Sequence, residues 1–299
     1  MHNVAFTLKT FLAHPLVFST YGVLMLSFLS MWVHKRVWIW APLILASIII
    51  AFLAKVIDDK ALVSIALLLG CHLCLRPELK GPLRLILVTL ASVISLGLLF
   101  HFMPGFNNWL IVKDMHVSPD GYPFTLYFNY DKPFIGIFVL GFNLALLSSW
   151  QEWKPKLLSI CFWIALTILA MMGLSLLFNT IHFDPKFPPI TLPWLLSNIF
   201  LVCIPEEAFW RGFLQREITN GFQDRTKWAP AIAIISISGG FALMHIFFVP
   251  HIAYIFLVFV ASALYGMAYH FTKSIECAIL VHFLLNLTQF FFFTYPALA

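Results

Sequence analysis

Charged side chains are scarce in this sequence. Asp, Glu, Lys and Arg make up 10% of its 299 residues, whereas about 25% is usual in soluble domains. Hydrophobic residues account for 61%, and 32 of the residues are Phe. A water-soluble fold cannot bury that much apolar surface. The composition therefore excludes an ordinary soluble protein and predicts one whose solvent is the lipid bilayer.

A basic stripe and a cysteine framework are both missing. The formal net charge of +5 is spread over short polar loops, which excludes nucleic acid as a partner. All five cysteines fall inside apolar runs, where they are expected to act as small hydrophobic residues. Cys71 and Cys74 have Cys-x-x-Cys spacing, but no second pair follows, so we expect no metal and no other cofactor there.

Ten apolar segments approach the length needed to cross a bilayer, which is roughly 20 residues. Charged or proline-containing breaks such as His34-Lys35-Arg36 and Asp184-Pro185 separate them. The sequence therefore predicts an all-α fold, a polytopic transmembrane helical bundle of about ten helices, with eight as the lower bound. The segments are 16–33, 37–54, 61–76, 82–103, 133–149, 157–178, 192–214, 229–248, 251–270 and 274–295.

The distribution of Lys and Arg predicts the orientation of this bundle. The loops after odd-numbered segments, together with Arg76 and Arg84 at the adjoining segment ends, hold eleven of them, while the N-terminus and the loops after even-numbered segments hold six. By the positive-inside rule, the odd-numbered loops face the cytoplasm. Both termini and the turn-rich interval 104–132, which we interpret as an extramembrane connector, then face outside.

Two adjacent carboxylates lie inside the seventh segment, in Ile204-Pro205-Glu206-Glu207-Ala208-Phe209-Trp210-Arg211. A charge at the centre of a membrane helix costs about 2.5–3.5 kcal/mol, so such groups are normally paired or functional. Glu207 and Arg211 are four residues apart, with Glu first, which favours a helical ion pair. Glu206 has Trp210 rather than a cation at its own i+4 position. We therefore expect Glu206 to be the carboxylate left to act.

Polar side chains also interrupt two later segments. His245 closes the eighth, in Phe241-Ala242-Leu243-Met244-His245, and the tenth carries His282 and Asn286, four residues apart on one helix face. A carboxylate, two imidazoles and a carboxamide on neighbouring helices can hold a water molecule and donate hydrogen bonds to an oxygen atom.

The motifs Glu-Glu-x-x-x-Arg, Phe-x-x-x-His and His-x-x-x-Asn, in this order, resemble those of the CPBP intramembrane glutamic endopeptidases. This family comprises CAAX proteases and bacteriocin-processing proteins and is also called Abi. The resemblance covers about residues 192–290. It implies Glu206 as general base, His245 as a holder of the water, His282 and Asn286 as stabilisers of the oxyanion, and Glu207 and Arg211 as supports of the site.

The resemblance also implies a domain organisation and partners. Residues 192–299 are then a CPBP-like catalytic helical core, and residues 1–191 are N-terminal membrane helices with the extramembrane loop 104–132. The expected partners are a membrane-embedded or lipidated protein or peptide substrate and the lipid bilayer, with no metal or other cofactor. A multi-pass location in a bacterial inner membrane is favoured, because nothing resembles an organelle-targeting segment.

Three other interpretations remain open. Glu206, His245 and His282 could bind a divalent metal in a metal-dependent membrane protease. Ser238 and His282 could act as nucleophile and base of a serine protease, since Ser236-Ile237-Ser238-Gly239 approaches the rhomboid pattern Gly-x-Ser-Gly. The chain could also be a transporter or a bacteriocin-immunity-type binding protein. A zinc protease of the His-Glu-x-x-His type is excluded, because no His here precedes a Glu.

Overall fold

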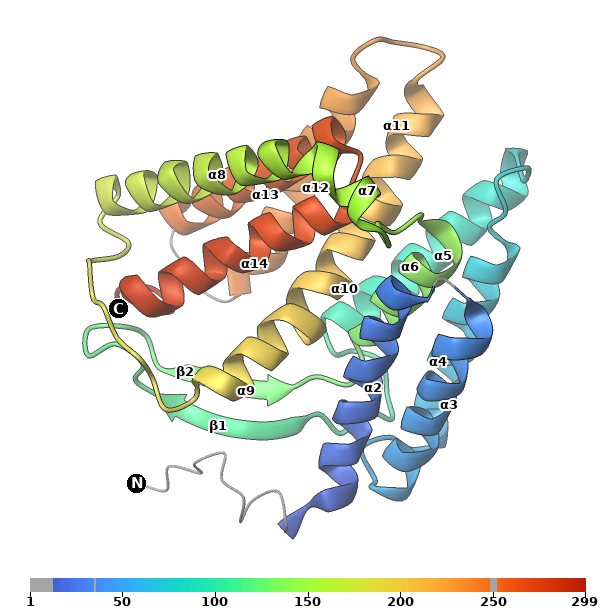
Figure 1. The fold of residues 1–299 in the computed structure, drawn as a ribbon, viewed down its shortest axis with the longest axis horizontal. Coiled ribbons are helices and arrows are strands. Elements are labelled where there is room, and N and C mark those ends of the chain that lie inside the picture. The colour runs from blue at the N-terminus through green and yellow to red at the C-terminus, as the bar shows by residue number, and fades with distance from the viewer. Residues whose placement is uncertain (1–12, 35, 248–251) are drawn as a thin grey trace. The chain divides into compact units, whose positions relative to one another are not determined.

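A computed structural model describes residues 13–34, 36–247 and 252–299 of the chain (Figure 1). The chain divides into two compact units, which are treated separately below. Unit 1 contains Met1–Ile111, Tyr127–Ser148 and Ile199–Phe209, and unit 2 contains Val112–Leu126, Ser149–Asn198 and Trp210–Ala299. The domain boundary expected at residue 191 stays a prediction.

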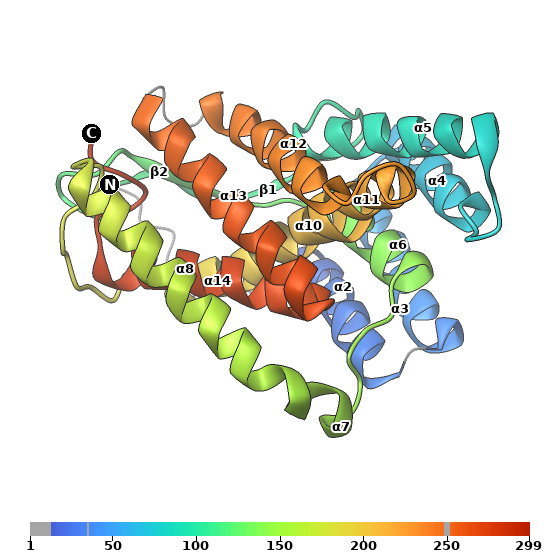
Figure 2. The ribbon, with the colours of Figure 1, turned by 90° about the horizontal axis from the view of Figure 1, so that it is seen from above.

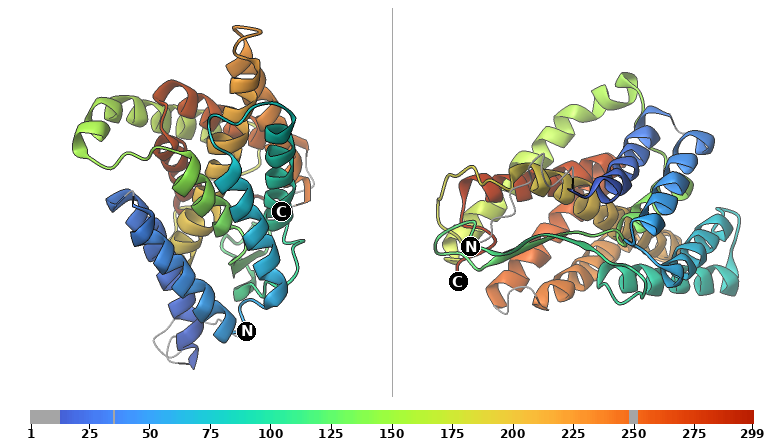
Figure 3. Two further views of the ribbon diagram at one scale, coloured as in Figure 1. Left: turned by 90° about the vertical axis from the view of Figure 1, so that its right-hand side faces the viewer. Right: turned by 90° about the horizontal axis from the view of Figure 1, so that it is seen from below.

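Unit 1 is built from apolar helices. α2 packs against α3 as a neighbouring pair (Figure 3), α4 packs against α5 and α6, and α6 also packs against α10. Proline at the first turn begins α2, α5 and α6, where its missing N–H has no intrahelical partner to lose. The bounds are α2 Pro15–Val33, α3 Val37–Leu53, α4 Asp59–Cys74, α5 Gly81–Leu99, α6 Pro133–Asn143 and α10 Ile204–Glu207.

Unit 2 is centred on three long helices, α8, α13 and α14, which pack on one another, while α12 lies beside α13 (Figure 2). Buried aliphatic and aromatic side chains such as Trp163, Leu264 and Val281 fill the space between these three helices. The bounds are α7 Trp150–Trp153, η1 Lys154–Lys156, α8 Leu157–Leu177, α9 Thr191–Leu196, α11 Arg216–Phe222, α12 Ala229–Met244, η4 His245–Phe247, α13 Ile252–Thr272 and α14 Ile275–Phe292.

Six helices in the described part of the chain are long and apolar enough to cross a membrane: Pro15–Val33, Gly81–Leu99, Trp150–Leu177, Thr191–Phe222, Ile252–Thr272 and Ile275–Phe292. α3, α6 and α12 are shorter apolar helices. On α8 the side chains of Leu158, Leu169 and Leu177 are exposed, as expected of a helix that faces acyl chains. The predicted polytopic helical bundle is thus confirmed.

The apolar runs locate the helices well. Each of the ten predicted segments starts within two residues of a helix in the structure, residue 251 itself lying outside the described part. Two ends differ most. α6 stops at Asn143 instead of residue 149, and the helix that contains the two glutamates continues to Phe222 instead of 214. The sequence Arg-Glu-Ile-Thr-Asn-Gly-Phe prolongs this helix although its apolar run has ended.

The prediction of a plain, turn-rich connector at 104–132 was wrong in one detail. This interval forms a two-stranded sheet of β1 (Trp109–Met115) and β2 (Phe124–Phe128). The strands read Trp-Leu-Ile-Val-Lys-Asp-Met and Phe-Thr-Leu-Tyr-Phe, which are rich in β-branched and aromatic residues and suit a pleated sheet. Within unit 2 the chain end joins the intervening turn, since the N–H of Ala299 donates to the Asp120 carbonyl.

Candidate active site

The two adjacent glutamates lie in a helix of unusual geometry. α10 is preceded by the π-helical stretch η2 (Ser197–Cys203) and followed by a second one, η3 (Ala208–Gln215). π-helical turns are rare and are found mostly at functional sites. Pro205 stands at the start of α10 and has no N–H to donate to the preceding turn, which accounts for a break in the α-helical pattern there.

Glu206 is buried and lies beside a cation. The Lys132 Nζ is 3.6 Å from the Glu206 Oε1, and the two side chains are only 10% and 7% exposed. Glu206 has no cation at its own i+4 position, but it has one from another segment, since Lys132 immediately precedes α6. Glu207 is fully buried, and its predicted ion pair with Arg211 stays a prediction.

The residue before Lys132 anchors this corner of unit 1. Asp131 is buried, and its Oδ2 accepts hydrogen bonds from His101 Nδ1 at 2.6 Å and from Asn108 Nδ2 at 3.1 Å. Its other oxygen accepts from the Lys132 backbone N–H at 2.9 Å. These contacts fix the backbone from which the Lys132 side chain extends toward Glu206.

A glycine one turn further along α6 allows the two helices of unit 1 to approach closely. A Cβ atom on Gly136 would lie 3.3 Å from Pro205 Cα and 3.2 Å from the Phe28 ring, tighter than most real contacts. Gly136 follows Lys132 by four residues and therefore shares its face of the helix. The absence of a side chain at Gly136 thus brings Lys132 within reach of Glu206.

In unit 2, Arg211 is fully buried between aromatic rings. Its guanidinium carbon lies 5.0 Å from the centre of the Phe241 ring and 5.2 Å from that of Tyr265. Its Nη2 donates to the Ser262 carbonyl at 2.9 Å and to the Ser262 hydroxyl at 2.6 Å. The planar, delocalised guanidinium can stack on rings and donate in its own plane at the same time, which an ammonium cannot.

The two predicted histidines contact the same rings. The His245 ring centre is 4.7 Å from that of Phe241, and the His282 ring stacks on Tyr265 at 4.6 Å and meets the edge of Phe241 at 6.1 Å. His245 Nδ1 lies 2.8 Å from the Phe241 carbonyl oxygen. Because a carbonyl only accepts, Nδ1 donates, which makes Nε2 the acceptor of the neutral ring.

Asn286 lies one helical turn after His282 on α14 and is half-buried. Its Nδ2 donates to Asn198 Oδ1 at 3.4 Å. This contact helps to orient the Asn286 carboxamide. Unit 2 thus brings together Arg211, both histidines and, one turn further along α14, Asn286.

The residues that sequence reasoning missed are Lys132, Asp131, Ser262, Tyr265 and Asn198. A signal was present for two of them, because Ser262 and Tyr265 are three apart in an otherwise apolar helix and so lie on one face. A second signal was the polar triplet Tyr130-Asp131-Lys132 directly before an apolar segment.

Two of the open alternatives can be compared with the geometry. Ser238 is buried in α12, and in the described part of the chain its hydroxyl has no hydrogen-bond partner. A serine nucleophile paired with His282 would show such a bond. Among residues 13–34, 36–247 and 252–299, no group of three His, Cys, Asp or Glu side chains is placed to hold a metal ion.

Comparison with known proteins bears on the same part of the chain. Residues 187–288 match the family model described as Type II CAAX prenyl endopeptidase Rce1-like. All seven named residues of the three motifs fall inside this match. No curated protein and no solved structure matches the chain.

The fold defines the class first, a multi-pass helical membrane protein. The family match then identifies the C-terminal third, and the predicted resemblance to the CPBP family is confirmed over these residues. Over residues 187–288, the match supports a membrane protease of the CAAX type at the level of the family.

Proposed function

We propose that this protein is an intramembrane glutamic endopeptidase. Glu206 takes a proton from a water molecule while the water oxygen attacks the carbonyl carbon of a peptide bond. His245 helps to hold the water, and His282 and Asn286 donate hydrogen bonds to the oxyanion. The carbon–nitrogen bond then breaks, and the proton passes to the leaving amine, giving a carboxylate and an amine.

The observation that carries this proposal is the cluster in unit 2. His245 and His282 come from different helices, yet both rings contact Phe241, and the Arg211 guanidinium lies over the same ring. Residues far apart in sequence are thus held against the same aromatic ring. Such preorganised donors lower a barrier by about 3–4 kcal/mol each, as judged by their removal.

Glu207 and Arg211 support the site in this proposal. Arg211 donates to Ser262 and lies against Phe241 and Tyr265, so it fixes the rings that hold both histidines. Lys132 contributes by holding the carboxylate of Glu206. One oxygen of Glu206, Oε1, lies beside the Lys132 ammonium, and in this proposal the other oxygen acts as the base.

The substrate we propose is a membrane-associated protein cut near its C-terminal tail. The description of the matching family names prenyl endopeptidases. A lipidated tail suits a site within membrane helices, because the acyl or prenyl chain partitions into the bilayer and delivers the adjoining peptide.

The test is cleavage of tail peptides by the purified protein in detergent, with farnesylated and unmodified peptides of the same sequence. Glu206→Gln removes the base while keeping the shape, and we expect the rate to fall by about 10²–10⁴. Glu78→Gln, at an exposed carboxylate, is the matched control and should cleave as the wild type does.

Three results would count against the proposal. Cleavage that survives Glu206→Gln would remove Glu206 from the mechanism. Activity that is lost with a chelator and regained with zinc would favour the metal-dependent alternative. If the wild type cuts neither peptide, a transporter or binding protein becomes the better explanation of the buried charges.

A further inference from the structure

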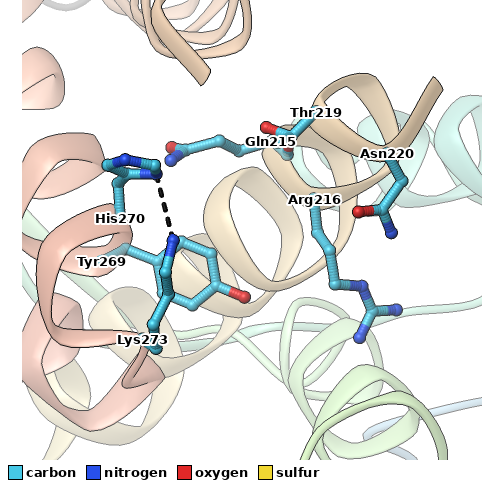
Figure 4. A pocket seen from close by; sticks show the side chains of 7 residues that line it. All are labelled: Gln215, Arg216, Thr219, Asn220, Tyr269, His270 and Lys273. Atoms are coloured by element: carbon cyan, nitrogen blue, oxygen red, sulfur yellow. Dashed lines mark hydrogen bonds between the residues drawn. The ribbon is translucent and has the colours of Figure 1, made fainter. Parts of the chain in front are cut away.

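A polar pocket lies in unit 2 where η3 and α11 pass the C-terminal end of α13 (Figure 4). Its volume is about 240 Å³. Its lining includes Gln215, Arg216 and Asn220 from one side and Tyr269, His270 and Lys273 from the other. The lining thus contains two cations and several hydrogen-bonding groups but no acidic residue.

The two cations favour an anion with several oxygen atoms. Lys273 Nζ lies 3.3 Å from His270 Nδ1 (Figure 4), and because an ammonium only donates, this nitrogen accepts and the ring is neutral. Arg216 presents a guanidinium, whose planar fork matches phosphate oxygens. Arg216 also has an acidic neighbour, because Glu217 Oε1 lies 3.8 Å from Arg216 Nη2. Glu217 itself does not line the pocket.

Gln215 indicates what the ligand carries beside its anionic group. The side chain is 3% exposed, and its Nε2 donates to the Gly266 carbonyl at 3.0 Å, which fixes the orientation of the amide. Within the described residues, its Oε1 is buried without a hydrogen-bond partner. Such an orphaned acceptor costs about 1–3 kcal/mol. This oxygen faces Gly266 and is closed off from solvent, so a hydroxyl or ammonium donor on a bound ligand satisfies it once the Gln215 side chain turns toward the pocket.

The location and the size of the pocket limit which anionic ligands it can hold. α13 is a candidate membrane span that ends at Thr272, so Lys273 lies at a membrane boundary. The loops on this side are odd-numbered and are predicted to face the cytoplasm, where anionic lipids gather around basic pockets. A cavity of about 240 Å³ is smaller than the roughly 300–1,000 Å³ of sites for drug-sized ligands, and it suits one headgroup better than a stretch of peptide.

We propose that this pocket binds the phosphate of an anionic glycerophospholipid together with a donor group on its headgroup. Arg216 and Lys273 contact the phosphate oxygens, and Gln215 Oε1 accepts from a headgroup hydroxyl. A soluble phosphate ester offers the same chemistry, and the test below separates the two sources.

The backbone conformation at Lys273 allows this cation to be removed without an expected loss of folding. Its φ angle is +51°, in the left-handed region that follows many helices and that usually belongs to Gly. Lys273→Gly therefore removes the cation and relieves strain in the same step, so loss of folding is not expected. Lys55 follows α3 with a φ of +58°, and Lys55→Gly is the matched control in unit 1.

The experiment measures the melting temperature of the purified protein in neutral detergent against added lipid. Phosphatidylglycerol should raise it for the wild type and for Lys55→Gly. Lys273→Gly should bind at least tenfold more weakly, and so should Arg216→Gln. Phosphatidylcholine, which has no net charge and no headgroup donor, should give a much smaller shift with the wild type.

Two further arms complete the test. Gln215→Leu should reduce binding of phosphatidylglycerol more than binding of phosphatidic acid, which lacks the headgroup hydroxyls. Glycerol 3-phosphate that displaces the lipid, with the same dependence on Lys273, would assign the site to a soluble ester, while failure to displace assigns it to lipid. The proposal is overturned if Lys273→Gly binds phosphatidylglycerol like the wild type, or if phosphatidylcholine binds equally well. These readouts do not depend on proteolysis.

Discussion

Units 1 and 2 stabilise their buried charges in different ways. In unit 1, the carboxylate of Glu206 lies beside the ammonium of Lys132. In unit 2, the guanidinium of Arg211 donates to the neutral Ser262 and lies over two aromatic rings. The stabilisation of Glu206 in unit 1 therefore depends on the positive charge of Lys132. The stabilisation of Arg211 in unit 2 depends on the planar shape of its own guanidinium.

Replacing Lys132 tests the first half of this comparison and should have the largest effect. Lys132→Met removes the cation beside a buried carboxylate, and we expect a loss of stability of about 3–5 kcal/mol. Lys132→Arg keeps the positive charge and should therefore retain most of the stability that Lys132→Met loses. Thermal unfolding in detergent measures both, with the exposed Lys80→Met as control.

A double variant shows whether this loss comes from the pair itself. Lys132→Met combined with Glu206→Gln removes both charges and should be more stable than Lys132→Met alone. If the double variant loses the sum of the two single effects, Lys132 and Glu206 do not interact and the comparison fails for unit 1.

Replacing Arg211 tests the second half. Arg211→Lys keeps the charge but loses the planar group that stacks on Phe241 and Tyr265 while donating to Ser262. We expect a loss of about 2–3 kcal/mol, from cation–π contacts and a charged hydrogen bond. Arg225→Lys, in an exposed loop, should leave the melting temperature unchanged. A fully tolerated Arg211→Lys would show that charge alone is sufficient in unit 2 as well.

The close approach of α6 and α10 sets the distance in the unit 1 pair. Gly136→Ala adds a Cβ that meets Pro205 Cα at 3.3 Å, and overpacking of this kind costs about 1–3 kcal/mol. Gly173→Ala on α8 is a matched control, because nothing lies within 4 Å of its Cβ. That variant should be neutral or slightly stabilising. Equal melting temperatures for the two variants would refute the packing argument.

A partly buried ion pair in unit 2, between Asp184 and Lys186, should have the smallest effect. A hydrogen bond from Ser118 lowers the pKa of Asp184 below its ordinary value, burial opposes this, and Lys186 at 3.0 Å adds to the lowering. A lowered folded pKa means that the stabilisation is present above the unfolded pKa, about 3.9, and is lost as pH falls through the folded value. Asp184→Asn should therefore melt slightly below the wild type at pH 6, with the gap closing near pH 3. A gap that widens in acid would contradict this sign.

The positions of the helices could be predicted from the sequence, but the side-chain contacts between them could not. Apolar run length fixes where a membrane helix begins, so each predicted start was accurate. The end of the helix at Phe222 was missed because polar residues prolong it beyond the apolar run. Strand residues between 109 and 128 were missed because the turn residues around Pro119 dominated the pattern.

The residues of the candidate site could be proposed from the sequence and stay a prediction, whereas their contacts could be anticipated only in part. Glu206, His245, His282 and Asn286 follow from polar residues that interrupt apolar segments, since the energetic cost of burial singles them out. Lys132 could not be found in the same way. Its contact with Glu206 joins two segments that only the packing around Gly136 brings together.

The π-helical stretches on either side of α10 take up extra residues in the helix that carries the two glutamates. A π turn holds an extra residue relative to an α turn, so deleting one residue there can restore an α turn and leave the helix beyond it in nearly the same phase. Where the helix is α-helical, as in α11, the same deletion would rotate everything beyond it by roughly 100° about the helix axis. η2 and η3 are therefore the places where this helix can lose a residue with the smallest rotation of its side chains.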